Sequence, residues 1–149
     1  MVRSGRFVAV TMLTVVSLWS LALAAPPAGA ASLRRQAVLH ALNERRHAHG
    51  LRRLDMPRWV SRYAKHHSRE MARRGTIFHT SDLGGVLSGV PWHEAGENVG
   101  AGGDWRSVMR AFMRSAEHRW NILHAAYRHV GVGLDNRRGS VFVTLFFYG

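Results

Sequence analysis

The sequence predicts an α+β domain folded as a three-layer α-β-α sandwich. Two stretches, residues 33–49 and 58–74, place their apolar side chains at the spacing of amphipathic helices. Two later stretches, residues 130–134 and 140–149, are rich in β-branched and aromatic residues and flank a turn, which is typical of a β-hairpin. Because the last stretch is apolar on both faces of a strand, helices should cover the sheet on both sides.

The two N-terminal helices are expected to end at glycines. The apolar stripe of the first consists of Leu33, Ala37, Val38, Ala41 and Leu42, and that of the second of Val60, Ala64, His67 and Met71. Gly50 follows the first stripe and Gly75 the second, and glycine commonly ends a helix. Each helix therefore has one face that should pack on the sheet.

A long loop is expected after the second helix. Residues 81–91 (SDLGGVLSGVP) are rich in Gly, Ser and Pro and show little periodicity. Loops of this length inside a compact domain are generally functional or disordered. A third helix should begin after Asp104, a good N-cap residue, and Ser115 should cap a short fourth helix through Leu123.

The C-terminal hairpin should consist of VGVGL (130–134), the turn DNRRG (135–139) and SVFVTLFFYG (140–149). In the final strand, valine and leucine on one face alternate with phenylalanine on the other, so neither face is polar. A strand that is apolar on both faces is expected at the centre of its sheet.

The N-terminus has the three parts of a secretory signal peptide. Early arginines form a positive region, residues 7–24 are almost uncharged and apolar, and Ala28-Gly29-Ala30 supplies small residues at a cleavage site. We therefore expect residues 1–30 to be a signal peptide and residues 31–149 to be the exported domain, with no transmembrane span after cleavage. The alternative is an uncleaved membrane anchor, since the apolar run approaches the ~20 residues that span a bilayer.

The chain has 149 residues, no cysteine and a formal net charge of +12. One compact domain fits this length, and an exported domain without disulfides points to a bacterial protein. The positive charge favours anionic partners. For an exported protein these are envelope polymers or lipids rather than nucleic acid, for which no basic-aromatic motif is present. The basic residues are scattered, so a generally solvated surface is the alternative.

The stretch PWHEAGENVG (91–100) contains His93 followed by Glu94, which is how the H-E-x-x-H zinc motif begins. That motif needs two imidazoles one turn apart on a helix, and position 97 is a glutamate. Proline and glycine in the stretch also disfavour a helix. We therefore expect the His93-Glu94 pair to be incidental.

Several short motifs, each weak alone, follow one another along the chain. They are LNERRHAHGLRRL (42–54), with Asn43, Arg46 and Gly50-Leu51, the stretch with Ala64, His67 and Met71, FHT (78–80), GEN (96–98), Ser115-x-x-His118-x-x-Asn121, and VGVG (130–133). In this combination the chain resembles the CAP superfamily of cysteine-rich secretory, antigen 5 and pathogenesis-related proteins, in its shorter cysteine-free bacterial form. The resemblance covers nearly all of residues 31–149 and implies the CAP type of α-β-α sandwich.

The resemblance implies a cleft in which two histidines hold a divalent metal, usually discussed as zinc, beside acidic residues. His79 and His118 match the two histidines, and Glu97 matches the acid of GEN. Imidazole nitrogens suit zinc, and a neighbouring carboxylate can take a proton from bound water, which makes Glu97 the catalytic candidate. The motif residues expected to line the cleft are Asn98, Ser115 and Asn121.

The chain departs from the family where many members carry a second acid, since Arg114 and Ser115 occupy that place. Glu117 cannot be assumed to replace it, because successive helical positions point about 100° apart. The acid and amide of GEN also have a structural alternative, which is to satisfy backbone groups of a turn. His118 likewise can belong to a hydrogen-bonding helix face. The remaining histidines, among them His67, are expected on the surface or in the core.

Two functions fit these observations, and the sequence leaves enzymatic activity open. In the first, the protein is a secreted binding module whose cleft holds a metal, a lipid or a peptide and whose basic surface adheres to the cell envelope. In the second, it is a metal-dependent hydrolase of peptide or envelope substrates, with His79 and His118 as zinc ligands and Glu97 as general base. No serine or cysteine nucleophile arrangement and no nucleotide-binding loop is visible.

Overall fold

The computed structural model describes residues 28–149. The predicted signal peptide, residues 1–30, lies outside this range except for its last three residues, which begin the first helix. Along the chain the elements are α1 (Ala28–Ala48), α2 (Arg58–Arg74), α3 (Leu83–Val86), β1 (Ala95–Gly102), α4 (Trp105–Arg114), α5 (Ala116–Leu123), β2 (His129–Arg137) and β3 (Ser140–Tyr148). Within these residues no helix has both the length and the apolar character needed to cross a bilayer.

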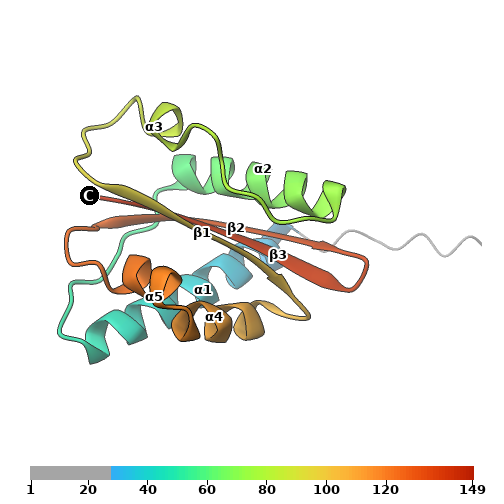
Figure 1. Cartoon of the computed structure of the whole chain (residues 1–149), viewed down its shortest axis with the longest axis horizontal. Helices are drawn as coiled ribbons and strands as arrows, with labels where there is room; N and C mark the ends of the chain where they lie inside the picture. Colours follow the sequence, from blue (N-terminus) through green and yellow to red (C-terminus); the bar gives the residue numbers. More distant parts are fainter. Residues whose placement is uncertain (1–27) are drawn as a thin grey trace, which may run out of the picture.

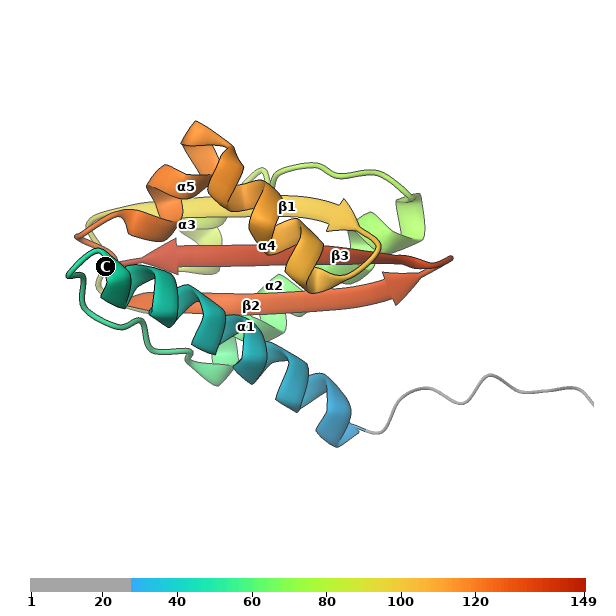
Figure 2. The same ribbon diagram turned by 90° about the horizontal axis from the view of Figure 1, so that it is seen from below.

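The elements form the predicted three-layer α-β-α sandwich. The strands pair antiparallel in the order β1-β3-β2, so β3 is central, as its two apolar faces predicted. Figure 1 shows α2 and α3 on one face of the sheet and α1, α4 and α5 on the other. In Figure 2 the view through the second face shows α1 running beside β2, and α4 and α5 lying over β1 and β3.

The helix ends follow the predicted signals. Gly75 ends α2 in the left-handed conformation, with φ of 70°. The side chain of Asp104 accepts a hydrogen bond from the Ser107 N–H at the start of α4, and the two residues form a capping box. Ser115 caps α5 by accepting from the His118 N–H at 3.5 Å. These caps confirm the predicted starts of both helices.

The hairpin turn is shorter than predicted. Strand β2 continues to Arg137, which pairs with Ser140, so residues 135–137 belong to the ladder and not to the turn. The reversal is left to Arg138 and Gly139, whose φ angles are 49° and 79°. Two consecutive residues with positive φ are what a tight hairpin turn of this hand requires, and they suit the right-handed twist of the strands.

The segment predicted as loop followed by the GEN motif contains two elements that the sequence did not reveal. A single helical turn, α3, lies within the expected loop, and Asp82 caps it by accepting from the Gly85 N–H at 2.6 Å. The GEN motif itself lies in β1, whose sequence AGENVGAG has few β-favouring residues. This strand forms because β3 pairs with it along its whole length.

The core lies on both sides of the sheet. Towards α1, α4 and α5 the largest cluster includes Val38, Leu42, Phe112, Ile122, Val143, Leu145 and Phe147. Towards α2 the buried side chains include Val60, Ala64, Met71, Phe142 and Phe146. Every buried member of these clusters lies between Val38 and Tyr148, so a polypeptide of residues 28–149 contains all of this packing.

Helix α2 lies unusually close to β2, and the glycines of VGVG allow it. A Cβ atom on Gly131 would lie 2.8 Å from the Val60 side chain, and one on Gly133 would overlap the backbone carbonyl of Ala64. Glycine is therefore needed at both positions so that the backbone of α2 can approach the strand. The Ser61 hydroxyl accepts from the Val132 N–H at 3.2 Å across the same interface.

Candidate functional site

Glu97 is the buried centre of the predicted site. It lies in β1 opposite Phe146, and its side chain is only 6% exposed. Its Oε2 atom lies 2.6 Å from Nδ1 of His79 and accepts from the Thr80 N–H at 3.0 Å. Its Oε1 atom lies 3.3 Å from the Thr80 nitrogen and 3.4 Å from Nε2 of His67. Both carboxylate oxygens are thus engaged, and they attach the FHT segment to the sheet.

His79 is held by Glu97 in a defined orientation. An ionised carboxylate only accepts hydrogen bonds, so the proton between the two groups is carried by Nδ1 of His79. In the neutral imidazole this leaves Nε2 with its lone pair, and the His79 side chain is 62% exposed. A carboxylate that orients the far nitrogen of an imidazole in this way is the usual partner of a metal-binding histidine.

His67 is buried, which is one of the two predicted environments, and its ring lies beside Glu97. Its Nε2 atom lies 2.8 Å from the backbone oxygen of Phe78, which can only accept, so Nε2 carries a proton. The same nitrogen faces Glu97, and the ring lies edge-on against the Phe78 ring at 5.0 Å. His67 is 9% exposed, so its contact with the carboxylate is buried. In the sequence, His67 belonged both to the apolar stripe of the second helix and to one of the motifs of the family resemblance.

A chain of amides joins α5 to β1 beside Glu97. Nδ2 of Asn98 donates to the His118 carbonyl at 2.9 Å. Nδ2 of Asn121 donates to Oδ1 of Asn98 at 2.9 Å and lies 3.2 Å from the Glu97 carbonyl. Asn98 is fully buried, and Ser115 caps α5. Three residues predicted to line the cleft, Asn98, Ser115 and Asn121, therefore make contacts that position α5 against the sheet.

His118 lies half-buried on α5. Its ring packs against Phe112 at 4.9 Å with an interplanar angle of 34°. Burial lowers the pKa of His118 below the usual 6.5, the positive charge of His79 lowers it further, and Glu117 partly offsets this. The imidazole is therefore kept neutral, which is the form that binds a metal or accepts a hydrogen bond.

Within the described residues, the candidate ligands fall short of the ligand set of a zinc centre. Among residues 28–149, no group of three or more His, Cys, Asp or Glu side chains is arranged to hold a metal ion. Catalytic zinc sites have three protein ligands and structural sites four. His79 and His118 supply two imidazoles, while Glu97 is engaged by His79 and Thr80. Zinc binding at His79 and His118 therefore stays a prediction.

The His93-Glu94 pair is not part of a zinc helix. Both residues precede β1 outside any helix, and the His93 N–H donates to the Gly149 carbonyl at 2.8 Å. The Glu94 carboxylate instead pairs with Nε2 of His124, whose ring stacks on Trp120. The rejection of the H-E-x-x-H motif is confirmed.

The sequence is similar to that of two longer Bacillus subtilis proteins. The uncharacterized protein YkwD is 31% identical over 103 residues, and the uncharacterized membrane protein YlbC is 29% identical over 107 residues. The aligned regions cover 64% and 67% of this chain but 40% and 31% of those proteins. The chain thus spans less than half the length of these relatives.

Solved structures share the fold. An extracellular protein with an SCP domain from Bacillus anthracis has a TM-score of 0.69 at 27% identity, covering 78% of this chain and 40% of that one. A cysteine-rich secretory protein from Staphylococcus aureus has a TM-score of 0.65 at 25% identity, covering 82% and 40%. An outer surface protein from Borrelia burgdorferi, at 15% identity, has a TM-score of 0.69 over 76% and 90% of the chains and shows the fold alone.

The family model described as the cysteine-rich secretory protein family, CAP, matches residues 39–148. This range runs from α1 to the end of β3 and includes His79, Glu97 and His118. The protein therefore belongs to the cysteine-rich secretory protein (CAP) family.

Proposed function

We propose that this protein is an extracellular binding module of the bacterial cell envelope. In this proposal the cleft at His79, Glu97 and His118 takes a ligand, which is a divalent metal, a lipid or a peptide. The basic surface attaches the domain to anionic envelope polymers or lipids. The extracellular SCP-domain relative from Bacillus anthracis supports the location, and the net charge of +12 supports the attachment.

The observation that carries the proposal is the burial and hydrogen bonding of the Glu97 carboxylate. Its carboxylate is nearly inaccessible and already accepts from His79 and the Thr80 N–H. A general base must reach the proton that it removes, with a free lone pair at hydrogen-bond distance. Glu97 is better suited to orient His79, whose exposed Nε2 can contact a ligand. The arrangement therefore favours binding over hydrolysis.

Attachment is tested with residues 28–149 by co-sedimentation with vesicles of phosphatidylglycerol and, as the neutral control, of phosphatidylcholine. Purified bacterial cell wall is the second target. At about 0.15 M ionic strength, charges more than ~8 Å apart are screened, so binding there requires close contact. We expect binding to the anionic vesicles or to the wall. If the protein stays in the supernatant with both targets, the attachment proposal is wrong.

The metal-dependent hydrolase is the second candidate, and the observation in its favour is the exposed His79 side chain, whose Nδ1 and not Nε2 faces Glu97. It requires zinc-stimulated cleavage of a peptide or envelope substrate that is abolished in Glu97→Gln while the fold is kept. That result would replace the binding module with an enzyme. Cleavage retained in Glu97→Gln would remove Glu97 from the chemistry.

A further inference from the structure

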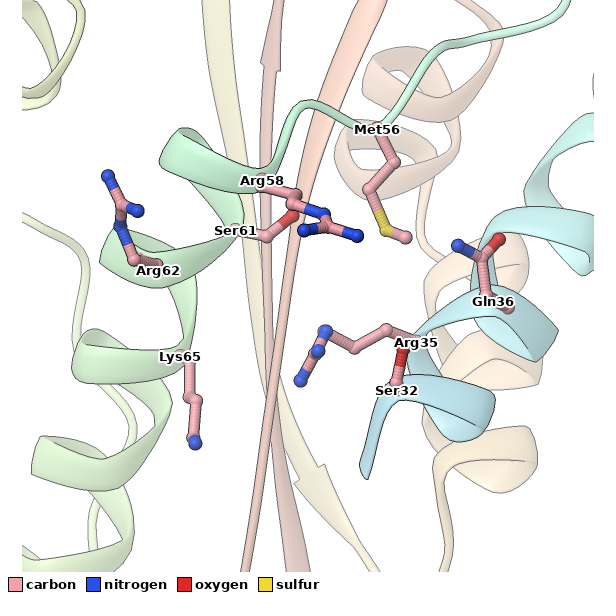
Figure 3. A pocket seen from close by; sticks show the side chains of 8 residues that line it. All are labelled: Ser32, Arg35, Gln36, Met56, Arg58, Ser61, Arg62 and Lys65. Carbon is pink, nitrogen blue, oxygen red and sulfur yellow. The ribbon is translucent and has the colours of Figure 1, made fainter. Parts of the chain in front are cut away.

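A cavity of about 450 Å³ opens between α1 and the start of α2, beside Met56. Its charged lining is entirely basic and consists of Arg35 from α1 with Arg58, Arg62 and Lys65 from α2. Figure 3 shows the guanidinium groups of Arg35 and Arg58 directed into the gap between the helices, with Lys65 extending along the same gap and Arg62 pointing away from it. His79, Glu97 and His118 are not among the residues that line this basic cavity.

The cations of the basic cavity have no acidic partner within the described residues. None of the ion pairs among residues 28–149 includes Arg35, Arg58, Arg62 or Lys65, and no carboxylate lines the cavity. Residues 1–27 contain no Asp or Glu at all, so that segment has no side-chain carboxylate to offer. Like charges directed into one gap repel one another, and a bound anion would replace this repulsion with attraction.

The start of α2 borders the basic cavity through Arg58 and Ser61. Its N-cap residue is Pro57, which provides no side-chain cap, and its first turn has no acidic residue. The first N–H groups of a helix have no partner within the helix and lie at the positive end of its dipole. The Ser61 hydroxyl also lines the cavity; it accepts from the Val132 N–H and keeps its own hydrogen for an acceptor.

We propose that the basic cavity binds a phosphate ester. Guanidinium groups match phosphate oxygens with two parallel hydrogen bonds, which assigns the phosphate to Arg35 and Arg58, with Lys65 as a further positive charge. A volume of about 450 Å³ accommodates a small phosphorylated group such as glycerol phosphate, and Met56 offers it an apolar contact. This inference rests on the proposed function, attachment to anionic envelope polymers or lipids, and names a phosphate ester as the group that is bound.

The first test is calorimetric titration of sn-glycerol 3-phosphate and of inorganic phosphate into residues 28–149 at low salt. The test variant is Arg35→Gln/Arg58→Gln. The matched control is Arg52→Gln/Arg53→Gln, which removes the same charge from two exposed residues of the α1–α2 connection outside the cavity. Circular dichroism of both variants checks that the fold is kept.

We expect saturable binding to the wild type and the control, and at least about tenfold weaker binding to Arg35→Gln/Arg58→Gln, because charged hydrogen bonds are lost. Equal weakening in both variants would show that only overall charge matters and would overturn the proposal. The absence of saturable binding in the wild type would overturn it as well.

The source of the phosphate is distinguished with vesicles of phosphatidylglycerol, whose head group carries the same chemistry. Vesicle binding that falls in the cavity variant but not in the control identifies a lipid head group, and an effect limited to soluble glycerol phosphate identifies a soluble or polymeric ester. If glycerol phosphate binds through Arg35 and Arg58 while vesicles and cell wall do not bind, the basic cavity stands and the attachment proposal fails. If vesicles bind equally to all variants and glycerol phosphate does not bind, attachment stands and the cavity proposal fails.

Discussion

Nδ1 of His79 lies 2.6 Å from Oε2 of Glu97, although the two residues are 18 positions apart. The bond joins the segment that follows α2 to the strand β1. It leaves the second nitrogen of an exposed imidazole available at the surface and surrounds the carboxylate with donors. In the proposed function, Glu97 positions His79, and His79 and His118 are the groups that would contact a ligand.

Replacing Glu97 with glutamine should loosen the FHT segment without unfolding the protein. A neutral amide accepts more weakly from the Thr80 N–H than a carboxylate does, because charge-assisted hydrogen bonds are the stronger kind. We expect the Thr80 amide to exchange its hydrogen about fivefold to tenfold faster in Glu97→Gln, as measured by NMR. The matched control is Glu117→Gln, which removes an exposed carboxylate next to His118. Unchanged exchange at Thr80 would contradict the positioning role.

Arg46 should be required for stability. Its fully buried guanidinium donates to four backbone carbonyls, those of Arg52, Ile122, His124 and Tyr127. Burial lowers the pKa of Arg46, and the charge of Arg128 lowers it further. In Arg46→Met the carbonyls of Arg52, Ile122 and His124 lose this donor, while that of Tyr127 keeps its bond from Arg128. We expect a loss of about 3 kcal/mol in the free energy of unfolding measured with urea.

The neighbouring exposed arginine is the control for that experiment. Arg45→Met should change stability by less than about 0.5 kcal/mol, since exposed substitutions away from special contacts have small effects. Equal effects of the two substitutions would contradict the structural role of Arg46.

The close approach of α2 to β2 is tested at Gly133. In Gly133→Ala the new Cβ would meet the backbone carbonyl of Ala64, which cannot move without displacing the helix. We expect a loss of about 3 kcal/mol in unfolding free energy, as is found for overpacked cores. Gly103→Ala is the control, because a Cβ there meets nothing within 4 Å. A stable Gly133→Ala variant would show that the two elements are not packed as described.

Stability should depend on pH through His118. Because burial and then the charge of His79 lower its folded pKa, the unfolded chain binds a proton more readily than the folded one. The contribution of neutral His118 to the free energy of unfolding is complete above the unfolded pKa of about 6.5. It is lost as the pH falls from there to the lower folded pKa. The urea concentration at the unfolding midpoint should therefore decrease as the pH is lowered from 8 to 5.5. The decrease should be smaller in His118→Gln. Identical pH profiles for the two proteins would contradict this assignment.

The sequence predicted the helices and the hairpin because their signals are local. The apolar stripe of α2 and the caps at Asp104 and Ser115 can be recognised from neighbouring residues alone. Strand β1 could not be recognised in this way, since three of its eight residues are glycines and its partner β3 lies some 40 positions further along. The end of β2 was misplaced for a related reason. Asp135 and Asn136 favour turns by local preference, but in the fold both residues pair with β3.

The site was predicted only in part. His79, Glu97 and His118 came from the resemblance to the family and not from spacing, because they lie in a loop, in β1 and in α5, far apart along the chain. His67 stood in one of the motifs, but its contacts with the Phe78 carbonyl and with Glu97 could not be predicted, because they form only in the folded chain. The basic cavity was missed because Arg35 and Arg58 belong to different helices and form no run of charge along the sequence.

The central claim is that His79 and His118 belong to one binding cleft. The most direct measurement is calorimetric titration of zinc into residues 28–149, beside His79→Ala and His118→Ala. If both imidazoles are ligands of the same ion, removing either one should abolish binding. We therefore expect weak saturable binding in the wild type and none in either variant. Equal weak binding in all three proteins would contradict the claim.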